Sequence, residues 1–316
     1  MKEYVAPAIL LNGHLETVYP SLFRKVKSLP YRRERIATPD DDFLDLDWMR
    51  RPDQSKKLVI ISHGLEGNAD RAYVRGMAKA FVDKGIEALA WNFRGCGDEL
   101  NRQKYFYHSG ASHDLDTVVT HAISTGRYTE IYLIGFSLGG NMTLKYLGEK
   151  GATVPSQIKK AVVFSVPMDL KAGCETISRP GNWIYSRRFV KSLIKKVVAK
   201  AALYRDIDIA GIEQIKTLLE FDNRYTAPLH GFNDALHYYS ESSANKYVSQ
   251  ITVPTLIVNA KNDPFLGPEC SPVSLLMHHP YVRLETPRRG GHVGFALFNP
   301  NGLYWSELRA LAFITS

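Results

Sequence analysis

The feature that most constrains the fold of this chain is the pentapeptide Gly-Phe-Ser-Leu-Gly at residues 135–139. It directly follows an apolar run at residues 131–134, typical of a buried β-strand, and precedes a helix-forming stretch at residues 140–147. A strand, a sharp turn and a helix in this order are the setting in which G-x-S-x-G presents a strained, exposed serine. The alternative is a glycine-rich turn with a spectator serine. The flanking pattern favours Ser137 as a nucleophile, with a helix N-terminus behind it that stabilises negative charge.

A serine nucleophile needs a base, and an acid that orients the base, and the downstream sequence supplies both in the order Ser, Asp, His. Asp263 lies in a polar turn after the apolar run 254–260, at the strand end where ligands bind in open α/β sheets. His292 lies in a glycine-rich loop after a shorter strand-like run at residues 281–286. We therefore predict Asp263 as the acid and His292 as the base. Asp169, which follows an earlier apolar run, remains the alternative acid and would otherwise be a helix N-cap or turn residue.

The string His-Gly-Leu-Glu-Gly at residues 63–67 has the position of an oxyanion loop, because it follows the strand-like run 58–62. Its glycines allow the backbone to turn so that an N–H group faces the substrate oxygen. We expect the backbone N–H groups of Leu65 and Leu138 to stabilise a negatively charged oxygen. His63, in the same loop, is expected to be structural and not a base.

Composition limits the remaining classes of protein. The 316 residues suffice for one large α/β domain with an insertion, and 45% hydrophobic residues allow a sizeable core. No stretch approaches the roughly 18–20 unbroken apolar residues of a membrane-spanning helix, and the N-terminus does not resemble a signal peptide. Three widely spaced cysteines predict a reducing, cytoplasmic environment, and none has zinc-site spacing. The net charge is +8, but the sequence contains no recognised nucleic-acid-binding module. The basic residues are therefore expected to form solvated surface or to make transient contact with an anionic membrane surface.

The order of apolar and helical runs predicts an α/β architecture with a mostly parallel central sheet flanked by helices. Residues 1–50 are expected to form an N-terminal extension that packs on the core, which comprises residues 51–166 and 247–316. In residues 167–246 the strand runs stop, which predicts an inserted helical cap over the site. Some of its aromatic side chains would line an apolar pocket while most pack within the cap, and the candidates are Trp183, Tyr185, Phe189, Tyr204, Phe221, Tyr225 and Phe232.

Five strings carry a family resemblance: Asn-Gly-His-Leu-Glu-Thr at residues 12–17, and those at 63–67, 92–97, 135–141 and 291–295. Together they resemble the α/β-hydrolase superfamily and, within it, the YheT-like (AB hydrolase-4) branch. That branch includes bacterial YheT-type hydrolases, eukaryotic ABHD-type lipases and yeast ethyl-ester synthases. The resemblance implies hydrolysis of carboxylic esters, without a cofactor.

Residues and resemblance together predict a serine carboxylic-ester hydrolase that acts through an acyl-enzyme on short- to medium-chain acyl esters or lipids. Its expected binding partner is a small-molecule ester substrate. The sequence pattern does not determine the oligomeric state. An alcohol acyltransferase that uses the same triad is the first alternative, because an alcohol can capture the acyl-enzyme in place of water. A non-catalytic ligand-binding protein on this fold is the second. The role of His14 stays open, with packing of the N-terminal arm favoured over catalysis.

Overall fold

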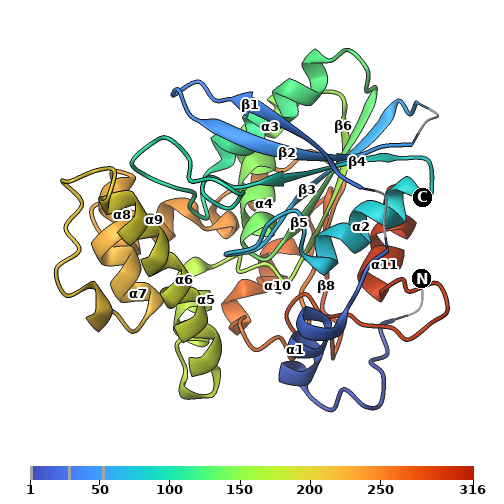
Figure 1. The fold of residues 1–316 in the computed structure, drawn as a ribbon. Helices are drawn as coiled ribbons and strands as arrows, with labels where there is room; N and C mark the ends of the chain where they lie inside the picture. Colours follow the sequence, from blue (N-terminus) through green and yellow to red (C-terminus); the bar gives the residue numbers. More distant parts are fainter. Residues whose placement is uncertain (1–2, 28–29, 52–53) are drawn as a thin grey trace.

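One eight-stranded sheet forms the centre of the computed structural model, which describes residues 3–27, 30–51 and 54–316 (Figure 1). Every pairing among β3 to β8 is parallel, whereas β1 pairs antiparallel with β2, and β2 with β4. The predicted mostly parallel sheet is therefore confirmed. In spatial order the strands are β1 (Arg32–Ala37), β2 (Phe43–Met49), β4 (Glu87–Asn92), β3 (Lys57–Ser62), β5 (Glu130–Phe136), β6 (Ile158–Phe164), β7 (Thr255–Val258) and β8 (Val282–Glu285).

Helices cover both faces of the sheet, which explains why the central strands are apolar along their whole length. In β3, Val59 and Ile61 join the core on one face, and Leu58 and Ile60 join the core on the other. The first face is covered by α2 (Ala72–Val82) and α11 (Trp305–Ile314), and the second by α3 (Ser112–Ser124) and α4 (Leu138–Lys150).

The N-terminal region differs from the simple extension that the sequence suggested, because β1 and β2 belong to the sheet. Arg33 pairs with Asp47 at 2.8 Å and Arg35 with Asp45 at 2.7 Å, so the charges that made this region look polar neutralise each other across the two strands. Before them lies α1 (Gly13–Phe23). Residues 1–2, 28–29 and 52–53, within the predicted extension and core, lie outside the described residues.

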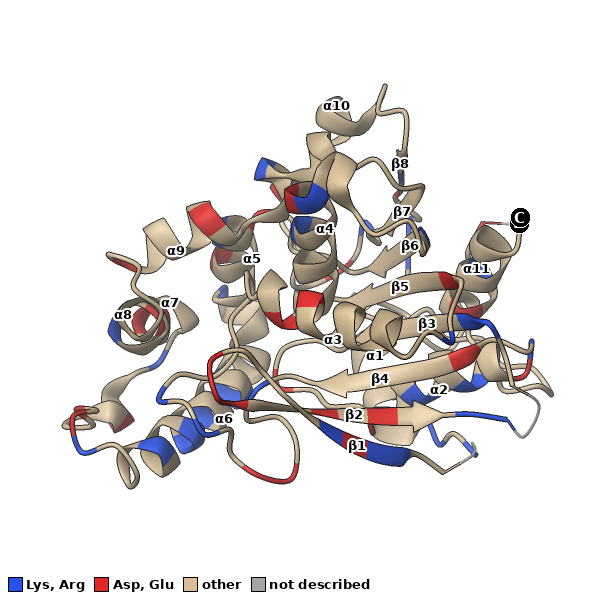
Figure 2. Cartoon of the chain, turned by 90° about the horizontal axis from the view of Figure 1, so that it is seen from above, with Lys and Arg blue, Asp and Glu red and all other residues tan. Residues whose placement is uncertain are grey.

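Residues 170–250, all of them described, form helices and turns without a strand; we call them the helical segment. Figure 2 shows this segment beside one end of the sheet, with β8 at the far edge next to α10 (Val273–Leu276). Among the residues that the structure describes, no helix has both the length and the hydropathy to cross a membrane. The main helices of the segment are α5 (Leu170–Ile177), α6 (Trp183–Ala201), α7 (Leu218–Phe221), α8 (Ala227–Leu229) and α9 (Ala235–Ser242).

Candidate active site

The turn between β5 and α4 holds Ser137 in an unusual backbone conformation, with φ +53° and ψ −121°. Such a conformation costs on the order of 1–3 kcal/mol and persists only where the surroundings enforce it. Gly135 and Gly139, on either side of this serine, cannot be larger residues because neighbouring backbone atoms leave no room for a Cβ atom. A Cβ on Gly135 would lie 2.6 Å from the carbonyl oxygen of Gly139, and a Cβ on Gly139 would collide with the carbonyl oxygen of His63. The strand, sharp turn and helix expected around this serine are therefore present.

Ser137, His292 and Asp263 form one hydrogen-bonded chain. Nε2 of His292 lies 2.9 Å from Oγ of Ser137, and Nδ1 lies 2.9 Å and 3.1 Å from the two carboxyl oxygens of Asp263. Because a carboxylate only accepts, Nδ1 carries the hydrogen, and the unprotonated Nε2 can accept the proton of the serine hydroxyl. The three residues meet because they follow β5, β7 and β8, whose carboxyl ends lie along one edge of the sheet.

Two other candidates from the sequence make structural contacts. Asp169 is the N-cap of α5, where its side chain accepts the N–H of Ala172 at 2.9 Å, and it is not the carboxylate beside His292. His63 is buried between the carbonyl oxygen of Gly64 at 2.7 Å and the N–H of Phe93 at 3.2 Å. Burial lowers the pKa of His63 to about 3, so the ring is neutral. The structural role expected for this histidine is confirmed.

The predicted oxyanion donors lie on the loop after β3 and at the start of α4. Leu65 and Leu138 line the same cavity as Ser137. Within the described ranges, neither of their N–H groups donates to a protein acceptor, whereas the next N–H, that of Glu66, donates to the hydroxyl of Tyr107 at 2.9 Å. The fold thus leaves both N–H groups without a protein acceptor among the residues that the structure describes, on two residues that line the same cavity as Ser137.

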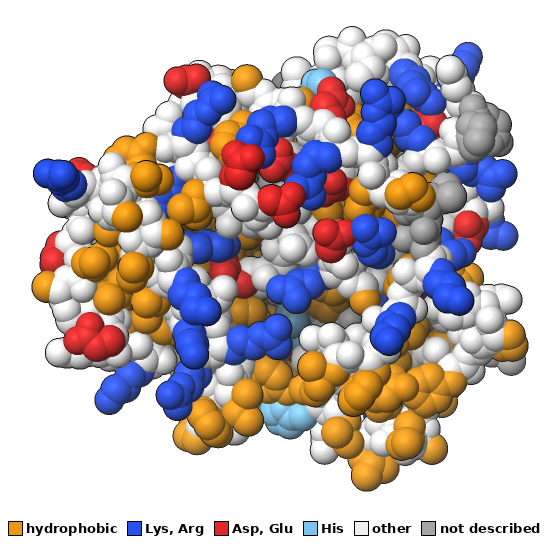
Figure 3. Space-filling view, viewed as in Figure 1, with side chains coloured by type: hydrophobic (Ala, Val, Ile, Leu, Met, Phe, Trp, Pro, Cys, Tyr) orange, Lys and Arg blue, Asp and Glu red, His pale blue; other side chains and the backbone are white. Residues whose placement is uncertain are grey.

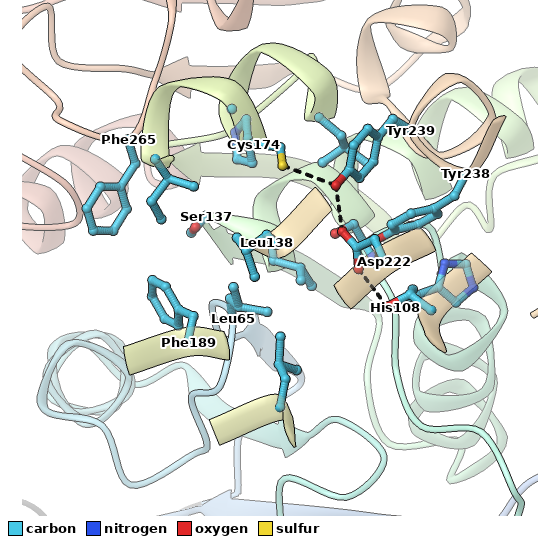
Figure 4. A pocket seen from close by; sticks show the side chains of 18 of the residues that line it. Leu65, His108, Ser137, Leu138, Cys174, Phe189, Asp222, Tyr238, Tyr239 and Phe265 are labelled. Carbon is cyan, nitrogen blue, oxygen red and sulfur yellow. Dashed lines mark hydrogen bonds between the residues drawn. The ribbon is translucent and has the colours of Figure 1, made fainter. Parts of the chain in front are cut away.

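An apolar pocket of about 820 Å³ opens from Ser137 towards the helical segment (Figure 4). We call it the acyl-side pocket. Of the seven aromatic residues considered from the sequence, only Phe189 lines it, and the others pack elsewhere or, like Trp183, are exposed. The apolar wall is made by eight aliphatic residues (Leu65, Leu138, Pro167, Leu170, Ile177, Leu193, Leu218 and Leu266) and by six aromatic ones (Phe106, Tyr107, Phe189, Tyr238, Tyr239 and Phe265).

The far end of the acyl-side pocket is polar, which the sequence did not indicate. Asp222 lies there in a short π-helix and accepts hydrogen bonds from Tyr239 at 2.7 Å and Thr226 at 2.6 Å (Figure 4). Burial raises the pKa of the Asp222 carboxyl to about 6. Nearby, burial lowers the pKa of His108 well below its ordinary value, so that this ring is neutral. The pocket therefore has an apolar wall and a hydrogen-bonded polar floor.

A second cavity, which we call the entrance groove, spans about 1370 Å³ including space open to solvent, and also reaches Ser137 and His292. Residues of α1, α2 and α6 line it, together with the arginines Arg71 and Arg188. Arg71 donates to the carbonyl oxygen of Glu66 at 3.0 Å, and no ion pair of Arg188 is found in the described part of the chain. Figure 3 shows Lys and Arg side chains gathered on this face beside exposed hydrophobic ones.

Comparison with known proteins decides the family. The family model Hydrolase_4, described as serine aminopeptidase, S33, matches residues 53–279. The chain is also 33% identical to the Escherichia coli (strain K12) protein YheT, over 99% of this chain and 93% of that one. The chain is an α/β-hydrolase of the YheT branch. It is thus an enzyme of the esterase and lipase type, and both the predicted superfamily and the predicted branch are confirmed.

More distant relatives extend the comparison. The chain is 28% identical to phospholipase ABHD3 of Bos taurus, over 84% of this chain and 66% of that protein. It is 30% identical to a monoacylglycerol lipase of Saccharomyces cerevisiae, over 84% of this chain and 59% of the lipase. Among solved structures, the Pyrococcus furiosus esterase Pf2001 superimposes with a TM-score of 0.61 at 18% identity, covering 92% of this chain and 95% of the esterase. At that identity the likeness concerns the fold.

Some residues around the site were missed by the sequence analysis. Glu16 and Thr17 of α1 contact the loop that carries His292, and the only signal was the string at residues 12–17, whose purpose remained open. His14 of that string lies outside the triad and stacks on Tyr185 of α6, with ring centroids 5.8 Å apart. No group of three metal-ligating side chains occurs among residues 3–27, 30–51 and 54–316.

Proposed function

We propose that this protein is a serine carboxylic-ester hydrolase that acts on short- to medium-chain acyl esters or lipids. The hydrogen-bonded chain from Ser137 through His292 to Asp263, at the opening of an apolar pocket, is the observation that carries this proposal. The names of two relatives, a phospholipase and a monoacylglycerol lipase, also support action on esters.

The mechanism begins when Nε2 of His292 takes the proton of Ser137 as Oγ attacks the ester carbonyl carbon. The carbonyl oxygen becomes negatively charged and accepts hydrogen bonds from the N–H groups of Leu65 and Leu138. Asp263 holds the ring in the required tautomer and stabilises the imidazolium. When the tetrahedral intermediate collapses, the C–O bond to the alcohol breaks and the imidazolium protonates the departing oxygen. Water, deprotonated by the same nitrogen, then releases the acid and regenerates the serine.

The two cavities divide the substrate between them. The acyl chain enters the acyl-side pocket, where each buried CH₂ contributes about 0.8 kcal/mol. The alcohol part lies in the entrance groove, whose lining includes Arg24, Arg71 and Arg188. The basic side chains of α6, next to exposed apolar side chains such as Trp183 and Ile184, suit transient contact of this opening with an anionic membrane surface (Figures 2 and 3).

The test compares wild type with Ser137→Ala on p-nitrophenyl butyrate and on the matching anilide. We expect the wild type to cleave the ester, and the variant to retain its circular dichroism spectrum while losing turnover. Preferential cleavage of the anilide would contradict the proposal and would indicate that the substrate is an amide and not an ester. Product analysis in added ethanol separates hydrolysis, which yields butyrate, from acyl transfer, which yields ethyl butyrate.

A further inference from the structure

The loop that carries His292 has little regular structure of its own. It follows β8 and contains left-handed backbone at Gly291, φ +58°, and at Val293, φ +56°. A loop in this conformation needs external contacts to keep one geometry. The imidazole can reach both Ser137 and Asp263 only if the backbone that carries it is held in place.

Side chains from other elements bind four successive backbone N–H groups of this loop, at residues 290–293. In chain order, the acceptors are Oε2 of Glu16 at 2.9 Å, Oδ1 of Asn262 at 3.1 Å, Oγ1 of Thr17 at 2.9 Å and Oγ of Ser165 at 2.9 Å. Two of these four acceptors belong to α1, the helix that begins with the unexplained string. The N–H of His292 itself donates to Thr17.

Glu16 connects the loops of the base and the acid. Its carboxylate is fully buried and accepts both from the N–H of Gly290 and from Nδ2 of Asn262, the latter at 2.7 Å. Asn262 is the residue directly before Asp263. On the outer side, Nε of Arg289 lies 2.7 Å from Oε1 of Glu16. A buried carboxylate is costly unless it is paired, and here its partners belong to the two loops that carry Asp263 and His292.

The backbone of α1 also lies unusually close to both loops. A Cβ on Gly13 would collide with the carbonyl oxygen of Asn262, and a Cβ on Gly291 would lie 2.8 Å from the Cβ of Glu16. Both positions therefore need glycine. The string at residues 12–17 thus combines a glycine that permits contact with two side chains that bind the loops.

We propose that α1 positions the catalytic base and acid, with Thr17 and Glu16 as the positioning residues. This inference rests on the proposed function of Ser137, His292 and Asp263. Thr17 fixes the backbone of His292, and Glu16 fixes the separation of the two loops. Neither side chain takes part in proton transfer, so both act through the geometry of the imidazole.

The test replaces Thr17 with Val, which has nearly the same shape but lacks the acceptor for the N–H of His292. Because small displacements of catalytic groups cost up to about 100-fold in rate, we expect Thr17→Val to lower kcat roughly 10- to 100-fold with KM changed less than about threefold. Thr17→Ser keeps the hydroxyl and should restore kcat to within about threefold of wild type. Thr117→Val is the matched control. Thr117, on α3 and away from the site, donates to the carbonyl oxygen of His113, just as Thr17 donates to the carbonyl oxygen of Gly13 four residues earlier.

A double-variant cycle separates positioning from general stability. In a His292→Ala background, Thr17→Val should lower the residual rate no further, since its effect passes through the imidazole. Undiminished kcat in Thr17→Val, or the same loss in both backgrounds, would overturn the proposal. If thermal unfolding shows that Thr17→Val is not folded at the assay temperature, Glu16→Gln takes its place. We expect Glu16→Gln to lower kcat, and an unchanged kcat would overturn the proposal. An inactive wild type would instead refute the proposed function.

Discussion

The two cavities that meet at Ser137 differ in the charge of the side chains that line them. The acyl-side pocket has an apolar wall, and neither Lys nor Arg is among the described residues that line it. The entrance groove contains Arg24, Arg71 and Arg188, and of these Arg24 is paired with Glu307. We therefore propose that the acyl-side pocket takes the apolar acyl chain, and that the entrance groove takes an alcohol part that is polar or negatively charged.

The contrast has a structural origin. The acyl-side pocket lies between the carboxyl ends of the parallel strands and the helical segment, where apolar residues from both meet. The groove lies between α1, α2 and α6, and α6 presents basic residues to solvent (Figure 2). Since Ser137 and His292 line both cavities, changes to the triad should affect all substrates alike, and changes in one cavity should affect only one half of the substrate.

The largest expected effect tests that common centre. Asp263→Asn should lower kcat by roughly 10⁴, because the amide no longer holds His292 in the required tautomer. The loss should be the same for short and long acyl chains and for neutral and charged alcohols. Asp169→Asn serves as the control and should change kcat little, since that side chain caps α5. A larger loss of kcat in Asp169→Asn than in Asp263→Asn would identify Asp169 as the acid of the triad.

The sequence predicts those site residues that local patterns mark, and misses those that depend on contacts between distant parts of the chain. Ser137, Asp263 and His292 each lie in the turn or loop that follows a strand, and short-range patterns of apolar runs and turn residues reveal strand ends. Glu16 and Thr17 belong to the string at residues 12–17, and neither of them was assigned a role from the sequence. Their burial depends on loops more than 240 residues later in the chain, as the separation of 274 residues between Glu16 and Gly290 illustrates, and no local periodicity encodes such docking.

The same reasoning applies to the fold. Helices were expected within residues 167–246, and α6 (Trp183–Ala201) is one of those observed there, because its amphipathic period is local. The entry of β1 and β2 into the sheet was not anticipated, because their alternating charges are neutralised only after pairing. The polar floor at Asp222 was missed for a similar reason, since its partner Tyr239 lies on another helix.

The second prediction varies the acyl chain while the alcohol stays constant. From acetate towards medium-chain esters, kcat/KM should rise by up to about fourfold per CH₂, because each methylene is buried against aliphatic side chains. It should fall once the chain meets the polar floor at Asp222. Lengthening the alcohol on a fixed acyl group should give a much flatter series. Equal slopes in the two series would remove the distinction between the cavities.

The third prediction concerns charge in the entrance groove. We compare two esters with the same acyl group, one of a neutral phenol and one of a hydroxybenzoate. Arg188→Gln should lower kcat/KM for the anionic ester by roughly two- to fivefold, the range expected for an exposed charge pair, and leave the neutral ester unchanged. Arg187→Gln makes the same change one residue away, outside the groove, and should affect neither. Equal effects of the two variants would indicate only the overall charge of α6.

The last prediction concerns stability and not turnover. Because burial raises the pKa of Asp222 to about 6, the folded protein keeps this proton at pH values where the unfolded chain has lost it. Its contribution to stability is present below about pH 4 and is lost as the pH rises through 6. Asp222→Asn does not ionise, so the unfolding free energy of wild type relative to this variant should fall by up to about 3 kcal/mol between pH 4 and pH 7.5. A difference that does not vary with pH would show that Asp222 is ionised throughout.

The most direct test of the central claim is to locate a covalent adduct. Wild-type protein is treated with a fluorophosphonate, and the site of attachment is mapped by mass spectrometry of its peptides. The account predicts one adduct, on Ser137, no labelling in Ser137→Ala, and much slower labelling in His292→Ala, because the base can no longer accept the serine proton. An unlabelled wild type that nevertheless hydrolyses esters, or an adduct on a different serine, would contradict it.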